Sequence, residues 1–224
     1  MLPVIHDEVT ACRRCARLVE WRERVGVEKR RAFREWEYWA RPVPGFGDPE
    51  ARLLVLGLAP AAHGANRTGR MFTGDRSGDF LYAAMHRAGF ASQPTSENRG
   101  DGLRLEGAWV SSAVKCAPPE NKPAPDERDA CLPFLVREIR ALTHLRAVVC
   151  LGGFGWDAAL RTLRELGCAL PAPLPRFGHG VEVPLENGLT LIGSYHPSQQ
   201  NTFTGRLTPA MLDDVFTAAR RIVG

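Results

Sequence analysis

Short apolar runs, each followed by a loop and an amphipathic stretch, organise the chain after residue 50. In the amphipathic stretches the apolar positions recur at the spacing of one helix face. Alternation of short strands with helices is typical of a mostly parallel sheet that helices cover on both faces. The predicted strands are residues 52–58, 108–115, 147–151 and 189–195, and the helices after them are approximately 77–88, 126–142, 155–166 and 209–222.

The first 40 residues have a different pattern. Residues 4–39 are predicted to be helical, with apolar positions on one face and charges such as the 28–31 run on the other. Pro42, Pro44, Gly45 and Gly47 then end any helix. We therefore expect one domain over residues 1–224, an α/β three-layer sandwich with a central four-stranded parallel sheet, and N-terminal helices over residues 1–40.

Composition adds few constraints. The chain has 224 residues, of which 44% are apolar, enough for one large core. Its start lacks a secretory pattern and no apolar stretch reaches bilayer-spanning length, so we expect a cytoplasmic monomer with no membrane partner. The net charge of +4 is modest. Arginines near the loops described below either attract a phosphate backbone or form a solvated surface.

The polar motifs follow the carboxyl ends of the predicted strands, where parallel sheets bind ligands. The first loop, residues 57–72, ends on Phe72, and the last contains His196. Backbone amides in such a loop can bind the polar edge of a base while an aromatic ring stacks on its face. The two loops therefore predict a pocket for a single nucleobase.

Four of the six cysteines have the spacing of metal ligands. Cys12 and Cys15 form a C-x2-C pair, and Cys116 and Cys131 flank a proline-rich loop. A cytoplasmic location argues against disulfides. The spacing does not separate a structural zinc site from an iron–sulfur cluster or from buried thiols. Such a centre would join the N-terminal helices to the loop after the second strand.

Several motifs occur together in one order: residues 57–60 leading to Asp75, the cysteine set, residues 118–123, and residues 196–201. In this combination the chain resembles the uracil-DNA glycosylase superfamily, most closely its type 5 branch of broad-specificity, iron–sulfur-containing enzymes. The resemblance spans nearly the whole chain. It implies a structural [4Fe–4S] cluster on Cys12, Cys15, Cys116 and Cys131.

The resemblance also implies a DNA repair activity. The enzyme would flip uracil, and other deaminated bases such as hypoxanthine, out of DNA and hydrolyse the N-glycosidic bond, leaving an abasic site. No amine nucleophile is evident, so we expect no strand cleavage through a Schiff base. The alternatives are a metal-stapled module that binds damaged or single-stranded DNA without catalysis, and a purely structural zinc protein.

Cleavage of this bond develops positive charge on the sugar and negative charge on the base. Related branches carry an acid or amide in the variable pair of the first loop, but here the pair is Leu58–Ala59, which is apolar. We therefore predict that Asp75 and His196 are the catalytic residues. The alternatives are a helix cap for Asp75 and a turn contact for His196.

The remaining predicted site residues contact the base or the DNA. Phe72 would stack on the base, the alternative being core packing, and Asn121 would bind the base edge, the alternative being a turn among prolines. The first loop would contribute Ala61, Ala62, His63 and Gly64 to the base pocket. The predicted DNA contacts are Arg70, Ser77, Lys115, Ser198, Gln199, Gln200, Asn201 and Arg206.

Overall fold

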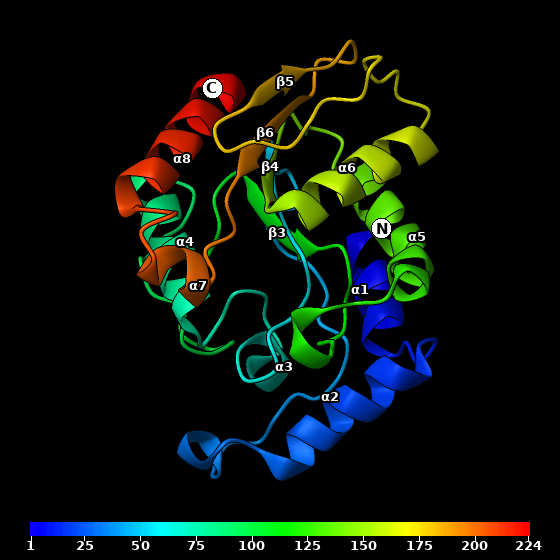
Figure 1. The fold of residues 1–224 in the computed structure, drawn as a ribbon, viewed down its shortest axis with the longest axis vertical. Coiled ribbons are helices and arrows are strands. Elements are labelled where there is room, and N and C mark those ends of the chain that lie inside the picture. Colours follow the sequence, from blue (N-terminus) through cyan, green and yellow to red (C-terminus); the bar gives the residue numbers. More distant parts are fainter.

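The computed structural model describes residues 1–224 and has a six-stranded mixed sheet at its centre (Figure 1). The sheet order is β1-β3-β2-β4-β6-β5. The inner four strands are parallel, as predicted, and lie within one to three residues of the predicted bounds. The strands are β1 (Phe46–Gly47), β2 (Leu53–Gly57), β3 (Ala108–Ser112), β4 (Ala147–Leu151), β5 (Glu182–Pro184) and β6 (Thr190–Ser194).

The four-stranded sheet of the prediction is corrected at both edges. β1 pairs antiparallel with β3, and β5 pairs antiparallel with β6. β1 has two residues and β5 three, and neither is buried throughout. Strands this short and exposed carry no alternation of apolar and polar residues that sequence inspection could detect.

Helices cover both faces of the sheet, which confirms the sandwich. Leu53 and Val55 of β2 point into the core beneath α4 and α8, whereas Leu54 and Leu56 point into the core beneath α5 and α6. The helices are α1 (Leu2–Thr10), α2 (Ala16–Glu28), α3 (Ala65–Thr68), α4 (Arg76–Arg87), α5 (Pro125–Ala141), α6 (Gly153–Glu165), α7 (Gln199–Phe203) and α8 (Pro209–Val223), with 3-10 turns η1 (Arg31–Phe33) and η2 (Pro119–Asn121).

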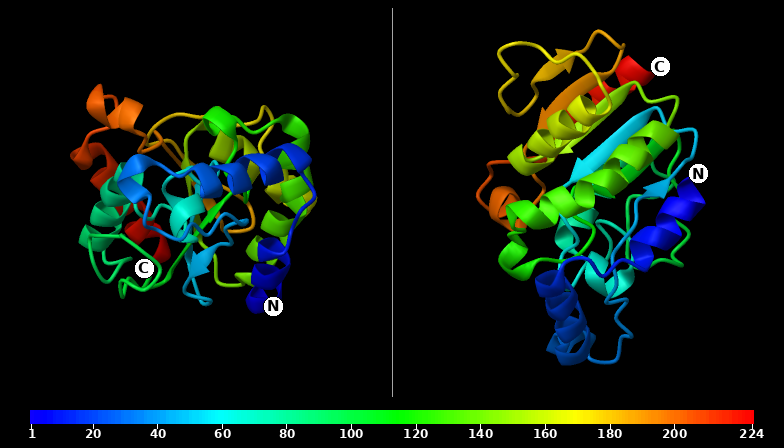
Figure 2. Two further views of the ribbon diagram at one scale, coloured as in Figure 1. Left: turned by 90° about the horizontal axis from the view of Figure 1, so that it is seen from below. Right: turned by 90° about the vertical axis from the view of Figure 1, so that its right-hand side faces the viewer.

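The N-terminal segment is less helical than predicted. It breaks between α1 and α2, and again after Glu28, where Lys29 adopts a φ of 52°. α1 packs against α5 through Ile5, Val9 and Phe134. α2 lies beyond the carboxyl ends of the parallel strands, at the same end as α3 (Figures 1 and 2). No helix is both long and apolar enough to cross a membrane.

Candidate active site at the carboxyl edge of the sheet

Asp75 ends the loop that follows β2 and caps α4. Its Oδ1 accepts a hydrogen bond from the Gly78 amide at 3.0 Å, so the capping alternative is present in the structure. Its other oxygen faces Gly64, where a side chain would overlap the carboxylate. Burial raises the pKa of Asp75 above its usual value, although amide hydrogen bonds from Gly78 and Ser77 oppose that shift. The cap holds the carboxylate against the first loop.

Phe72 lies beside His196 although the two are far apart in sequence. Their ring centroids are 5.9 Å apart, with an interplanar angle of 37°. Phe72 also packs over Gly57, where a side chain would overlap its ring. Its φ of 51° is unfavourable for a residue with a Cβ and costs about 1–2 kcal/mol. The fold therefore holds Phe72 in a strained conformation next to the last loop.

His196 follows β6 and is neutral near pH 7. Burial lowers the pKa of His196 to about 4. Its backbone carbonyl accepts a hydrogen bond from Asn201 Nδ2 at 2.9 Å, which ties α7 to the histidine. A neutral imidazole can donate one hydrogen bond, as a group that stabilises a developing anion must.

The first loop keeps several amides free. The amides of Gly64 and Asn66 both donate to the Ala61 carbonyl, so they serve the turn itself. The amides of Ala61, Ala62 and His63 have no intramolecular acceptor. Three adjacent free donors can bind the carbonyl groups of a ligand. Gly64 contributes space for the Asp75 carboxylate, and its amide is used within the turn.

The side chain of His63 has a hydrogen-bond partner within the chain, whereas that of Asn121 has none. The Nδ1 atom of His63 is 3.1 Å from the Tyr38 hydroxyl, and burial, with help from Arg30 and Arg67, lowers the pKa of His63. Asn121 is exposed on η2, with a φ of 56°, and its side-chain amide makes no hydrogen bond within the chain. No hydrogen bond joins Asn121 to Phe72, Asp75 or His196.

Residues 44–220 match the family model described as the uracil DNA glycosylase superfamily. The chain belongs to this superfamily. It is 58% identical to the type-5 uracil-DNA glycosylase of Mycobacterium tuberculosis over 217 residues, 96% of this chain and 80% of the relative. It is 54% identical to that of Mycobacterium leprae over 224 residues, covering 100% and 96% of the two chains. The type-5 enzyme of Thermus thermophilus is 52% identical over 216 residues, covering 96% and 95%.

The predicted ligand cysteines of this superfamily member converge. Cys12, Cys15, Cys116 and Cys131 line one cavity between α1, α2, α5 and the loop after β3. No group of three or more His, Cys, Asp or Glu side chains in the structure is arranged to hold a metal ion. Cys150 is buried in β4, and Cys168 accepts a hydrogen bond from Asn187 at 3.3 Å, so both lie outside the cavity.

Arg22 is the charged partner of this cavity. Its side chain is 2% exposed, and its Nη1 donates to Cys116 Sγ at 2.9 Å. Both terminal nitrogens also donate to the Cys12 carbonyl, whereas its Nε has no partner. A buried cation among thiols fits a set of ligands that carries negative charge.

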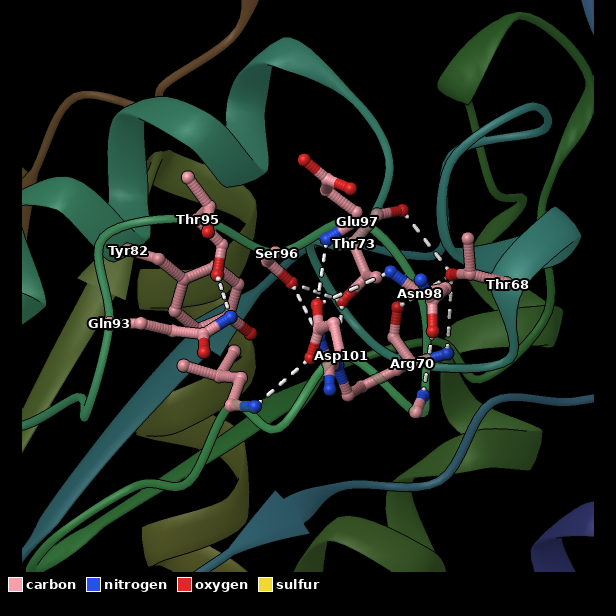
Figure 3. Close-up of polar contacts among 12 residues, drawn as sticks. Thr68, Arg70, Thr73, Tyr82, Gln93, Thr95, Ser96, Glu97, Asn98 and Asp101 are labelled. Carbon is pink, nitrogen blue, oxygen red and sulfur yellow. Dashed lines mark hydrogen bonds and ion pairs between the residues drawn. The ribbon is translucent and has the colours of Figure 1, made fainter.

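Two of the predicted phosphate contacts are wrong. Lys115 is 1% exposed, and its ammonium contacts Glu138 and Ser111, each at 2.6 Å. Arg70 is buried in a network with Asp101, Ser96 and Thr73, at 2.7, 2.9 and 2.9 Å (Figure 3). Both cations are neutralised inside the protein and have no exposed charge to offer to DNA.

The other predicted DNA contacts are distributed over α7 and its surroundings. Gln199, Gln200 and Arg206 are exposed, and the Arg206 guanidinium lies 4.7 Å from the centre of the Tyr195 ring. Ser198 caps α7 by accepting from the Asn201 amide at 3.3 Å, and Asn201 braces His196 as described above. Ser77 lies half-buried in the first turn of α4.

Sequence inspection gave no individual site role to three residues that the structure places near these loops. Arg67 is buried between two aromatic rings, Tyr38 contacts His63, and Phe203 is 66% exposed on α7. Phe203 could have been identified from the sequence, because a phenylalanine in a polar run is unusual. The burial of Arg67 could not, because it depends on segments far away in the sequence.

Proposed function

We propose that this chain is a monofunctional uracil-DNA glycosylase that acts on DNA. It flips uracil, and other deaminated bases such as hypoxanthine, out of the helix and hydrolyses the N-glycosidic bond to leave an abasic site. The names of the relatives at 52–58% identity support uracil as a substrate. The loop that holds Phe72 and Asp75 meets the loop of His196, whose ring lies beside Phe72, and this convergence carries the proposal.

The two proposed catalytic residues stabilise charges of opposite sign. The neutral imidazole of His196 donates a hydrogen bond to the carbonyl where negative charge collects on the leaving base. Asp75, as a carboxylate, orients the attacking water and stabilises positive charge on the sugar. The Asp75 carboxylate is ionised only when the pH is above its raised pKa.

Base recognition uses the free amides of Ala61, Ala62 and His63 together with the Phe72 ring. Amide donors bind a carbonyl oxygen, which uracil and hypoxanthine both carry, and stacking on Phe72 tolerates either ring. The neighbouring pair Leu58–Ala59 has no polar side chain that would select one base edge over another. Broad specificity follows from this combination.

The four cysteines are the proposed ligands of a [4Fe–4S] cluster. Four thiolates can hold either such a cluster or a zinc ion. The resemblance to iron–sulfur-containing type 5 enzymes favours the cluster, and the thiols line one cavity in which Arg22 supplies a compensating charge. When bound, the cluster would cross-link the N-terminal helices to the loop after β3, a structural role.

The deciding experiment incubates the purified protein with duplexes that contain one uracil or one hypoxanthine and then cleaves abasic sites with alkali. Release of both bases supports the proposal. DNA binding without release would favour the non-catalytic alternative. Borohydride should trap no covalent DNA adduct, because each of the three lysines has a partner within the chain. Lys115 is held by Glu138, Lys122 is paired with Glu120 at 3.2 Å, and Lys29 donates to the Arg34 carbonyl at 3.1 Å.

The cofactor has its own test. Iron and acid-labile sulfide are measured in the wild-type protein and in C116S, with C150S as the matched control, since Cys150 is buried outside the cavity. We expect iron and sulfide to be lost in C116S and retained in C150S. Stoichiometric zinc without sulfide in the wild type would contradict the cluster.

A further inference from the structure

Arg67 is held between two aromatic side chains of the segment that follows α2. Its guanidinium carbon lies 3.8 Å from the centre of the Phe33 ring and 4.1 Å from that of Trp36. Arg67 is 3% exposed, whereas Trp36 is 38% exposed. The segment 31–36 therefore covers Arg67 from the solvent side.

The buried charge of Arg67 has no carboxylate within salt-bridge distance. Its Nε donates to the His63 carbonyl at 2.8 Å and its Nη2 to the Gly74 carbonyl at 2.7 Å, while Nη1 has no partner. An isolated buried cation is costly, so it persists only where the ring faces and carbonyls compensate it. Stability alone does not explain this arrangement, and energetically costly arrangements of this kind cluster at functional sites.

The two carbonyls that Arg67 contacts belong to the two halves of the proposed site. His63 ends the run of free amides, and Gly74 directly precedes Asp75. A side chain on Gly74 would overlap Nη2 of Arg67, so the guanidinium fits closely against this turn. One side chain therefore sets the spacing between the amides that would bind the base and the carboxylate that would act on the sugar.

We propose that Arg67, clamped by Phe33 and Trp36, is the positioning residue that fixes Asp75 relative to the amides of residues 61–63. This inference rests on the proposed glycosylase activity. Misplacement of a reacting group by about 1 Å can reduce a rate about 100-fold, so a clamp at this position would affect chemistry more than binding.

The charges around Asp75 give the expected direction of the pH effect. Burial raises the pKa of Asp75, amide hydrogen bonds from Gly78 and Ser77 lower it, Asp79 on α4 raises it, and Arg67 lowers it. Removal of Arg67 takes away one of the influences that lower the pKa of Asp75, so this pKa rises. The acidic limb of the rate profile should then move to higher pH.

The test measures single-turnover uracil release from pH 4 to pH 9 for wild type, R67M, R67K and W36L, with R99M as the control. Arg99 is exposed and lies 4.4 Å from the Trp39 ring, so R99M also removes a cation from an aromatic face.

We expect R67M to lose about 10- to 100-fold in rate with unchanged DNA affinity and an acidic limb at higher pH. R67K should recover part of the rate that R67M loses. W36L should lose less rate than R67M, and R99M should match wild type.

A double-variant comparison decides between positioning and general destabilisation. In a D75A background R67M should cause no further loss of rate, because the residue it positions is gone. An equal loss in both backgrounds, or no shift of the acidic limb in R67M, would overturn the inference. If R67M does not fold, W36L leaves the cation in place and carries the same test.

The proposed function and this inference can fail separately. If the wild type releases no base, the function is wrong, and amide hydrogen exchange at residues 61–75 then tests the clamp alone. Faster exchange there in R67M than in R99M supports the clamp. Equal exchange in the two variants contradicts it.

Discussion

The loops after β2 and after β6 meet at one edge of the sheet but are built in opposite ways. Residues 64–73 of the first loop are all buried, and their polar side chains bond to one another and to neighbouring carbonyls. In the second region Gln199, Gln200 and residues 203–206 are exposed. The first loop has little freedom, whereas the second presents side chains to solvent.

Because the two loops differ in burial, chemically similar residues have different roles in them. Arg67 and Arg70 are structural because the protein surrounds them, and Arg206 is available to a phosphate because it is not surrounded. A rigid loop suits groups that must be placed accurately for catalysis. An exposed one suits contact with DNA of any sequence.

The largest effect is expected at the rigid loop. D75A should slow base release about 10²- to 10⁴-fold, because it removes the carboxylate that would orient water. DNA affinity, measured by fluorescence anisotropy, should stay within about twofold of wild type. D157A is the matched control, since Asp157 is exposed on α6 and takes part in no ion pair. Full activity in D75A would remove this residue from the mechanism.

A slightly smaller effect, on folding, should come from the buried ion pair. E138A leaves Lys115 charged and without its carboxylate in the core and should reduce the free energy of unfolding by about 3–5 kcal/mol in urea. E182A removes the partner of exposed Arg221 and should change the free energy of unfolding by less than about 1 kcal/mol. Similar losses in the two variants would contradict the burial of the Lys115–Glu138 pair.

Acid should weaken the Arg70 network. Burial raises the pKa of Asp101, but hydrogen bonds from Arg70 and from backbone amides outweigh it and lower the pKa to about 2 from 3.8. This carboxylate then contributes about 2 kcal/mol at neutral pH, and the contribution disappears as pH falls from 3.8 to about 2. The stability difference between wild type and D101N should narrow over this interval. A constant difference would show that Asp101 has an ordinary pKa.

The smallest effect should come from the exposed loop. F203A removes an aromatic side chain that the Arg76 guanidinium approaches to 5.4 Å from the ring centre. We expect about tenfold weaker DNA binding, with the rate of base release at saturating enzyme nearly unchanged. V27A is the control, because Val27 is 82% exposed on α2. Equal affinity of F203A and wild type would mean that this surface does not bind DNA.

By itself the sequence determined the alternation of strands and helices and the order of the motifs at the carboxyl edge, because each element and motif depends on residues close together in the chain. Only the tertiary structure decided that Lys115 and Arg70 are internal ions, that Asp75 is also a cap, and that Arg67 lies between Phe33 and Trp36. The edge strands β1 and β5 likewise exist only through their pairing partners. The physical reason is that segments distant in sequence form the environment of a long polar side chain. A buried charge must be compensated inside the protein, whereas an exposed charge can bind a ligand.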